Sequence, residues 1–468
     1  MNSKADICEF IWNIEDKYNL FSKTIDGVYF WELLRFRLVQ HIYDLKNYGS
    51  KTINPDHKSV IKQWVKLSKH LLFSIRNSYL YGTRMKTKQV DILIFEHARK
   101  KMNNGIYIDI YTNDFLKKCI KNKCNYEVIE SPFQGKHYCK TDSKRRYRDH
   151  YYISYFFRKL NLKLSRNRNV IFNKKDIVLL KQLQKSFNNR YDICINFNSL
   201  VVNQISQFKI EYDFYYELLQ IKNPKQVYIV VGYGQKPLIS ACKNNSVEVI
   251  EFQHGLISRY HMGYSYPLNQ KLYYYPDKLY LFGKYWSKNT PLPDKNTKFE
   301  YTGFPYFENL VKKKTISKKK NQVVFISQLP VQEQLFEIAY RFAQKNKIYD
   351  VFFKFHPKEQ MKEKSILIGE KAKSLLNFTL IQKVQADIYD LLSSAEYIVG
   401  VYSTSVYEAL ALKCKPILIN LSGIENMGDI INSGTAAVAE DEDDIYEIIK
   451  NYTFTSMNTQ ILFANLNE

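Results

Sequence analysis

Three short stretches of the sequence combine residues that can do chemistry with positions just after predicted buried strands. They are Gln-His-Gly at residues 253–255, His-Pro at residues 356–357 and Ser-Thr-Ser at residues 403–405. An imidazole has an ordinary pKa of about 6.5, so it can accept or release a proton at neutral pH. Hydroxyl groups at the start of a helix can help to hold a phosphate. These residues suggest acid/base catalysis beside a bound phosphate.

The hydroxyl turn is the strongest of the three signals. A buried strand at residues 396–402 ends at Ser403, Thr404 and Ser405, and a helical pattern carrying Glu408 follows. Free N–H groups, the positive end of the helix dipole and three hydroxyls would together bind a phosphate. Ser405-Val-Tyr-Glu408 also fits a helix capping box, which is the structural alternative. Capping does not require three consecutive hydroxyl residues, so we favour phosphate binding.

A second turn, His-Pro, ends the predicted strand at residues 350–355, one βα unit earlier. Proline ends strand pairing and fixes the turn, which directs the preceding imidazole out of the sheet. One nucleotide lying across the strand ends could contact both turns. We therefore assign His356, Pro357 and Lys358 to the same nucleotide site as the hydroxyl turn and Glu408.

Two glycines after the predicted strand at residues 226–231 do not make a dinucleotide site. Gly232 and Gly234 match the first two positions of GxGxxG, but Pro237 stands where the third glycine is required. We interpret this turn as a close approach of the backbone.

Apolar runs that alternate with helical patterns predict an α/β protein with two doubly wound domains in tandem. The predicted strands are residues 90–96, 191–197, 226–234, 247–252 and 277–283, then 322–327, 350–355, 378–382, 396–402 and 415–420. Ligands of such domains bind at the carboxyl ends of the strands. We expect an N-terminal domain at residues 1–310, a lysine-rich linker at 311–321 and a C-terminal domain at 322–468.

Two segments depart from the βα pattern. Residues 57–88 place apolar side chains at helical spacing among lysines and arginines, and residues 136–190 are rich in Lys, Arg and Tyr. A basic amphipathic helix can lie on an anionic membrane surface. A helix packed on the domain with a solvated basic face is the alternative. The second segment suits either an acidic polymer or a solvated loop and helix.

Composition narrows the classes of function. The 468 residues include 69 Lys and Arg against 46 Asp and Glu, and the net charge of +23 favours an anionic partner. Seven scattered cysteines without a CxxC pair support neither a disulfide framework nor a zinc site. The first twenty residues carry four acids where a signal peptide would be apolar, and no apolar run reaches the roughly 18 residues of a membrane span. We expect a cytoplasmic protein without a metal or cofactor.

Together these motifs resemble those of the GT-B glycosyltransferases that assemble bacterial capsule, lipopolysaccharide and teichoic acid. The His-Pro and hydroxyl turns look like the pair that holds the cytidine nucleotide in bacterial sialyl- and polysialyltransferases. Residues 386–410 are similar to a segment of CDP-glycerol glycerophosphotransferases, which also carry a Trp-His-Gly motif like residues 253–255. Residues 302–305, Thr-Gly-Phe-Pro, resemble the hinge of such enzymes. Sialyltransferases have two acids before a glycine, whereas this chain has only Asp26 before Gly27.

The resemblance implies a GT-B fold, in which two Rossmann-like doubly wound domains face a central cleft. The C-terminal domain would bind a nucleotide-activated donor, with CMP- or CDP-linked donors favoured, and Gly303 would border it. The N-terminal domain would bind a surface-polysaccharide or lipid-linked glycan acceptor that receives a sugar or a polyol phosphate without a metal. The acceptor cleft would be lined by Gln253, Gly255, His261, Gly232 and Gly234. His254 would be the general base, with Glu251 as an alternative base. A peripheral position on the inner face of the cell membrane would add an anionic membrane surface as a partner.

Two other functions stay open. UDP-N-acetylglucosamine 2-epimerases have a similar turn architecture, so the fold does not determine the reaction. A non-catalytic RNA- or polyanion-binding protein would use the +23 charge and the 38 tyrosines. The sequence has no RNP-like aromatic motif, which disfavours specific nucleic-acid binding.

Overall fold

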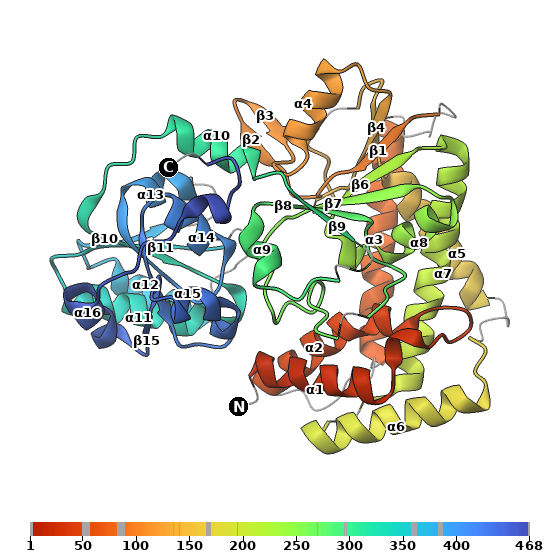
Figure 1. Ribbon diagram of the computed structural model, residues 1–468, viewed down its shortest axis with the longest axis horizontal. Coiled ribbons are helices and arrows are strands. Elements are labelled where there is room, and N and C mark those ends of the chain that lie inside the picture. Colours follow the sequence, from red (N-terminus) through yellow and green to blue (C-terminus); the bar gives the residue numbers. More distant parts are fainter. Residues whose placement is uncertain are drawn as a thin grey trace.

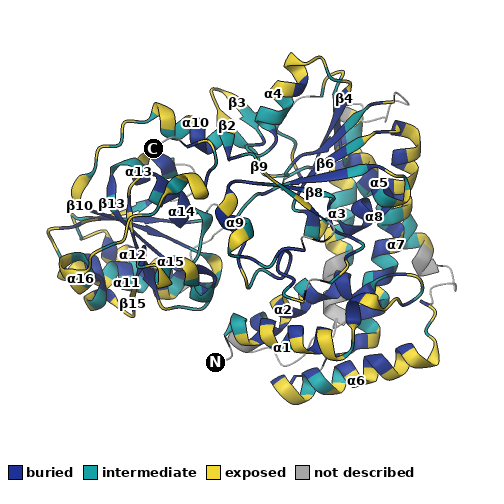
Figure 2. Cartoon of the chain, viewed as in Figure 1, coloured by how far each residue is buried: buried dark blue, intermediate teal, exposed yellow. Residues whose placement is uncertain are grey.

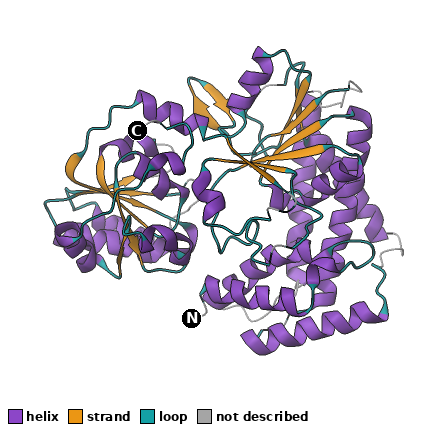
Figure 3. Cartoon of the chain, viewed as in Figure 1, coloured by secondary structure: helices purple, strands orange, loops and turns teal. Residues whose placement is uncertain are grey.

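Two parallel sheets, each covered by helices, organise the computed structural model (Figures 1 and 3). The structure describes residues 3–48, 57–81, 89–133, 135–139, 141–164, 170–193, 195–268, 270–293, 295, 297–356, 363–381 and 387–466. The predicted α/β fold of two doubly wound domains is confirmed by these sheets.

The N-terminal sheet has seven parallel strands in the order β5-β4-β1-β6-β7-β8-β9. Their bounds are β1 (Ile92–Phe95), β4 (Tyr126–Glu130), β5 (Arg145–Tyr147), β6 (Gln226–Val230), β7 (Glu248–Phe252), β8 (Lys278–Leu281) and β9 (Lys298–Tyr301). A small antiparallel hairpin, β2 (Lys101–Asn103) and β3 (Ile106–Ile108), follows β1. One face of the sheet packs against α4 (Asn113–Lys121), and the other packs against α5 (Asp149–Leu164), α7 (Phe197–Lys222) and α8 (Lys236–Asn244).

The C-terminal sheet has six parallel strands in the order β12-β11-β10-β13-β14-β15. Their bounds are β10 (Lys319–Ile326), β11 (Asp350–Lys354), β12 (Phe378–Ile381), β13 (Ala395–Gly400), β14 (Lys415–Ile419) and β15 (Ala437–Ala439). Alternate residues of β10 enter two different buried clusters, because successive side chains of a strand point to opposite faces. Helices α11 (Gln332–Lys345), α12 (Glu363–Ala372) and α16 (Glu442–Asn451) cover one face. Helices α13 (Ile388–Ser394) and α14 (Thr404–Ala411) cover the other.

The remaining helices surround these layers. They are α1 (Lys4–Lys17), α2 (Phe30–Tyr48), α3 (His57–Tyr81), α6 (Lys174–Tyr191), α9 (Lys284–Lys288), α10 (Pro305–Lys313) and α15 (Gly428–Asn432). Figure 2 shows that α1 and α6 present exposed residues on one side and buried residues on the other. None of the helices in the described ranges is both long and apolar enough to cross a membrane.

One predicted strand is wrong. The described residues of this segment, 191–193 and 195–197, are the end of α6, part of a connection and the first residue of α7, not a strand. The residues at 191, 193, 195 and 197 are buried among helices. Their alternating apolar pattern therefore reflects packing in a helix-to-helix connection, where Asp192 ends α6 in the left-handed conformation with φ 51°. The other predicted strands are present.

The basic segments have the following structure. Helix α3 occupies residues 57–81 of the first insertion, and residues 82–88 lie outside the described residues. The second insertion contains β5, α5 and α6. Within the proposed linker, α10 continues to Lys313 and β10 begins at Lys319.

The two sheets share a contact region. One continuous buried cluster contains side chains from both halves of the chain. The Tyr285 and Tyr407 hydroxyls lie 3.1 Å apart, and Ser258 Oγ donates to Asn426 Oδ1 at 2.7 Å. The C-terminal segment returns to the N-terminal sheet, where Trp286 Nε1 donates to the Leu462 carbonyl at 2.9 Å. These contacts hold the ends of β7 and β13 close to each other.

Candidate active site

The Gln-His-Gly turn lies directly against the hydroxyl turn of the other sheet. A Cβ atom built on Gly255 would be 3.6 Å from Thr404 Oγ1. His254 follows β7 and Thr404 begins α14, so two motifs 150 residues apart meet at the carboxyl ends of their strands. This is the edge at which α/β domains bind ligands.

The hydroxyl turn forms the N-terminus of α14. Ser403 is the N-cap residue, with φ −164° and ψ 149°, and its side chain accepts a hydrogen bond from the Ser405 N–H at 3.2 Å. The cap is therefore Ser403, and Ser405 lies inside the first turn, so the capping box that starts at Ser405 does not form. One hydroxyl of the three caps the helix, and the Thr404 hydroxyl faces the N-terminal domain.

A buried carboxyl and a tyrosine stand behind His254. Tyr264 Oη donates to Glu251 Oε1 at 2.6 Å and lies 3.3 Å from His254 Nδ1. Glu251 Oε1 also accepts from the Gly232 N–H at 2.8 Å. Glu251 is completely buried, whereas His254 keeps part of its surface exposed. His254 can therefore reach a substrate directly, and Glu251 can act only through Tyr264.

Gly232 is required by this arrangement. A Cβ atom on Gly232 would lie 2.2 Å from Glu251 Oε2, well inside van der Waals contact. The predicted close approach is thus an approach to the Glu251 carboxyl. Gly234 has no comparable constraint, since a Cβ atom there would meet only the Val231 side chain at 3.8 Å.

Burial changes the pKa values of both groups in opposite directions. Burial raises the pKa of Glu251 from its ordinary 4.5 to about 7, because it disfavours the charged carboxylate. Burial, with a smaller effect from His97, lowers the pKa of His254 from 6.5 to about 3. His254 is therefore neutral at pH 7, and Glu251 is close to half ionised.

A ring of aromatic and imidazole side chains surrounds His254. The His97 ring is stacked on the His254 ring with centroids 6.4 Å apart, and the Tyr111 ring is edge-on at 6.3 Å. Asp109 holds both residues, because its carboxylate accepts from the His97 N–H at 2.8 Å and from the Tyr111 N–H at 3.1 Å. Burial raises the pKa of Asp109 to about 6.

His261 belongs to the same group of rings. Its ring centroid lies 4.9 Å from that of Tyr264 and 5.2 Å from that of Tyr233. Burial lowers the pKa of His261 to about 3, with a smaller contribution from Lys4. The structure thus brings His261 to the Tyr264 side of the site rather than leaving it in a remote loop.

Gln253 holds the Gln-His-Gly turn through side-chain hydrogen bonds. The side chain is buried, its Nε2 donates to the Gly255 carbonyl at 2.9 Å, and its Oε1 accepts from the Phe282 N–H at 2.8 Å. This pair of bonds connects the turn after β7 to the end of β8. Gln253 and Gly232 are both buried, and their hydrogen bonds hold the ends of β6 and β7 in place.

Helices α1 and α2 hold the loop that carries Tyr264. Buried Arg35 forms an ion pair with Glu15, with Nε and Oε1 2.7 Å apart, and donates to the Ser265 carbonyl at 3.1 Å. The Glu32 carboxylate accepts from the backbone N–H groups of Tyr273 and Tyr274 at 2.8 and 3.1 Å. Satisfied buried charges of this kind keep the loop in one conformation.

Glu408 lies in a second buried group, between the β2–β3 hairpin and α13. Burial raises the pKa of Glu408 to about 7, while Lys101 and the Tyr389 hydroxyl oppose that change. Lys101 Nζ lies 3.1 Å from Asp387 Oδ2 and 4.6 Å from the centroid of the Tyr389 ring. The β2–β3 hairpin thus contacts the C-terminal half of the chain beside α14.

His356 follows β11 at the same edge of the C-terminal sheet as the hydroxyl turn. Strand β10 separates β11 from β13 in that sheet. Pro357 and Lys358 lie outside the described residues.

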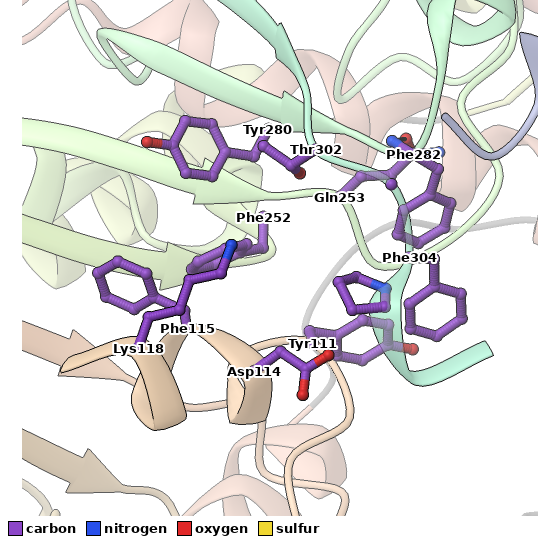
Figure 4. A pocket seen from close by; sticks show the side chains of 12 residues that line it. Tyr111, Asp114, Phe115, Lys118, Phe252, Gln253, Tyr280, Phe282, Thr302 and Phe304 are labelled. Atoms are coloured by element: carbon purple, nitrogen blue, oxygen red, sulfur yellow. Dashed lines mark hydrogen bonds between the residues drawn. The ribbon is translucent and has the colours of Figure 1, made fainter. Parts of the chain in front are cut away.

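Gly303 lies in the turn before α10, with φ 77°, and a Cβ atom there would be 2.1 Å from Asn465 Nδ2 and 2.4 Å from Glu308 Oε1. Gly303 also borders a pocket of about 60 Å³ next to Gln253 (Figure 4). The pocket is lined by Tyr111, Asp114, Phe115, Lys118, Phe252, Gln253, Tyr280, Phe282, Thr302, Gly303, Phe304 and Pro305. These residues come from α4 and the turn before it, the ends of β7 to β9, and the turn into α10 with its first residue.

Sequence reasoning missed Tyr264, His97 and Tyr111. His97 follows the predicted strand at residues 90–96, so the rule that selected His254 would also have selected His97. Tyr264 has no such signal, because it lies in a loop whose contact with Glu251 depends on the path of the chain between β7 and β8.

Comparison with known proteins gives distant structural similarity only. No protein-family model and no curated protein matches the chain. The chain is similar to UDP-GlcNAc 2-epimerase from Methanocaldococcus jannaschii in complex with UDP-GlcNAc and UDP, at 13% identity and a TM-score of 0.47, over 81% of this chain and 96% of that chain.

Two other similar structures are TarM and the MurG of Acinetobacter baumannii. TarM is 11% identical over 78% of this chain and 92% of that chain, with a TM-score of 0.41. MurG is 12% identical over 79% and 92% of the two chains, with a TM-score of 0.39. Similarity at this level assigns neither a reaction nor a site residue.

Proposed function

We propose that the chain is a glycosyltransferase that moves a sugar or a polyol phosphate from a nucleotide-activated donor to a surface-polysaccharide or lipid-linked glycan. The observation that carries the proposal is the contact between the two strand-end turns, with Gly255 next to Thr404. A donor phosphate at the start of α14 would lie beside His254. An acceptor hydroxyl on the His254 side would then be placed for attack.

The donor site in this proposal is the N-terminus of α14. The N-terminal end of α14 and the Thr404 hydroxyl would bind the leaving phosphate, and the helix dipole would stabilise the charge that develops on it. Glu408 and His356 would contact the nucleotide from the same edge of the sheet. A cytidine nucleotide is favoured by the resemblance of the two turns to those of cytidine-dependent transferases.

His254 would be the general base, supported by Tyr264 and Glu251. Because the single Tyr264 proton is donated to ionised Glu251, the Tyr264 oxygen can only accept from His254, which places the imidazole proton on Nδ1. Nε2 is then free to take the proton of the acceptor hydroxyl. The resulting imidazolium would be stabilised through Tyr264 by the Glu251 carboxylate. This support would act against the low basicity that burial gives to His254.

A pair of variants tests the proposal. His254→Ala should retain nucleotide binding and lose transfer, because it removes the base and leaves α14 intact. Tyr264→Phe should also retain nucleotide binding but lower transfer by roughly 100-fold, within the range of general acid–base contributions. Transfer at the wild-type rate by His254→Ala would refute the assigned role.

A panel of CMP, CDP, UDP and GDP identifies the donor. A nucleotide at about 100 times its dissociation constant stabilises the protein by roughly 2.7 kcal/mol, which a thermal-shift measurement detects. A preference for UDP or GDP would contradict the cytidine assignment and leave the transferase proposal intact. Turnover of a nucleotide sugar with no acceptor present would instead support an epimerase.

A further inference from the structure

Helix α3 presents an apolar face to solvent. Along this helix, Val65, Leu72 and Tyr79 are 49%, 66% and 89% exposed, and Ile75 is 47% exposed. The spacing of seven between the first three places them in one stripe, since side chains three or four residues apart share a face of a helix. A contiguous set of large exposed apolar side chains indicates an interaction surface.

The stripe lies opposite the face by which α3 packs on the domain. On the packed face, Ser74 and Asn77 are buried, and Asn77 Nδ2 donates to Asp149 Oδ1 of α5 at 2.9 Å. His70 stacks on Tyr152 of α5 with ring centroids 6.0 Å apart. One side of α3 is thus packed against the domain, and the apolar stripe lies on the other side.

Basic side chains complete the exposed stripe. Lys69 and Arg76 are exposed and fall between the apolar residues at the same helical spacing, and exposed Lys66 lies beside them. The 25 residues of α3 contain no aspartate or glutamate. A face that mixes cations with large apolar side chains and lacks acids is complementary to anionic phospholipid, where apolar groups enter the headgroup boundary and cations bind phosphate.

We infer that α3 is a membrane-docking helix that binds an anionic phospholipid surface through Val65, Lys69, Leu72, Arg76 and Tyr79. A second copy of the chain is a poorer occupant, because two helices with only positive charges would repel each other when paired along this face. Docking needs no sugar nucleotide, so the inference stands apart from the proposed reaction. It would hold the enzyme at the surface where a lipid-linked acceptor is presented.

The test uses vesicles of phosphatidylglycerol and phosphatidylcholine, with pure phosphatidylcholine vesicles for comparison. The full-length protein should co-sediment with the anionic vesicles, less so as salt increases. Each basic residue near such a surface contributes about 1 kcal/mol, which is roughly fivefold in affinity. The double variant Lys69→Gln, Arg76→Gln should therefore bind roughly 30-fold more weakly.

A matched control lies on α12 of the other domain. Leu367 is 66% exposed, as is Leu72, and exposed Lys371 follows it by four residues as Arg76 follows Leu72. Leu72→Ser, Arg76→Gln should weaken vesicle binding, and Leu367→Ser, Lys371→Gln should not. In a second measurement, Leu72→Trp should shift its fluorescence to shorter wavelength with anionic vesicles, and Leu367→Trp should not.

Four outcomes would overturn the inference. They are no binding of the full-length protein to anionic vesicles, equal binding to neutral vesicles, unchanged binding by the α3 variants, and an equal effect of the α12 variants. A change of sedimentation mass in the α3 variants without a change in vesicle binding would assign the face to a second copy. None of these results depends on whether the protein transfers a sugar.

Discussion

The substitution Glu251→Gln tests the buried carboxyl on which the proposed proton transfer depends. Glutamine has the shape of a protonated glutamate, and its Oε1 can still accept from Gly232 and Tyr264. In the described part of the chain no group donates to Glu251 Oε2, so an amide nitrogen there meets no competing donor. The variant therefore removes the titration and keeps the packing.

The magnitude follows from the two pKa values of the carboxyl. The pKa is about 7 in the folded protein and 4.5 in the unfolded chain. Below pH 4.5 the Glu251 carboxyl is protonated in both the folded and the unfolded state, so its titration does not lower the unfolding free energy. As pH rises the unfolded chain loses its proton first, so folding loses free energy until pH passes 7. Each pH unit in this window costs about 1.4 kcal/mol, and the sum is about 3 kcal/mol.

Urea unfolding of wild type and Glu251→Gln at pH 5 to pH 8 measures this effect. The unfolding free energy of the variant relative to wild type should rise by roughly 2.5 kcal/mol between pH 5 and pH 8. Glu248→Gln on the same strand is the control. Lys278 lowers the pKa of Glu248, so the stability that Glu248 contributes is lost only at a more acidic pH. The difference in unfolding free energy between Glu248→Gln and wild type should therefore stay nearly constant from pH 5 to pH 8. A change below about 0.5 kcal/mol for Glu251→Gln would refute a raised pKa.

Three further predictions concern single positions of the site. Gly232→Ala forces a Cβ atom against a carboxylate oxygen and should lower the unfolding free energy by about 1–3 kcal/mol, measured by urea unfolding. Ser403→Ala removes the cap of α14 and should cost about 1 kcal/mol and weaken nucleotide binding in calorimetry. His261→Gln should reduce the stability that the protein loses in acid. The pKa of His261 is about 3 in the folded protein and 6.5 in the unfolded chain, so protonation of the unfolded chain lowers the unfolding free energy by about 3 kcal/mol at pH 4.5. Acid melting curves identical to wild type would contradict the last prediction.

The architecture and each of the two motifs, taken separately, were predictable from the sequence. Long apolar runs reveal strands that are buried on both faces, and strand ends of parallel sheets are where polar motifs gather. Turns such as residues 253–255 and 403–405 could therefore be selected one at a time. Their contact follows from the way the two sheets pack, which requires long-range contacts such as Ser258 to Asn426.

The burial of His254 and Glu251, and therefore their pKa values, could not be predicted from the sequence. His254 was selected for an ordinary pKa of about 6.5, but in the structure its pKa is about 3. Glu251 was only an alternative base, and it stands behind His254 with a pKa of about 7. Both values depend on how much protein surrounds each group. The Tyr264 loop, held by Arg35 and Glu32, covers these groups together with His97 and Tyr111. No local sequence pattern predicts the position of this loop.

Two buried carboxyls, one from each domain, flank the contact between the domains. Glu251 lies behind His254, Glu408 lies on α14, and burial raises the pKa of each to about 7. His254 is neutral across the same pH range, so its own titration cannot set the pH dependence near neutrality. Ionisation of Glu251 would favour the imidazolium, and ionisation of Glu408 would place negative charge near a donor phosphate. The two ionisations therefore have opposite effects on the proposed transfer, which should be fastest at a pH close to 7.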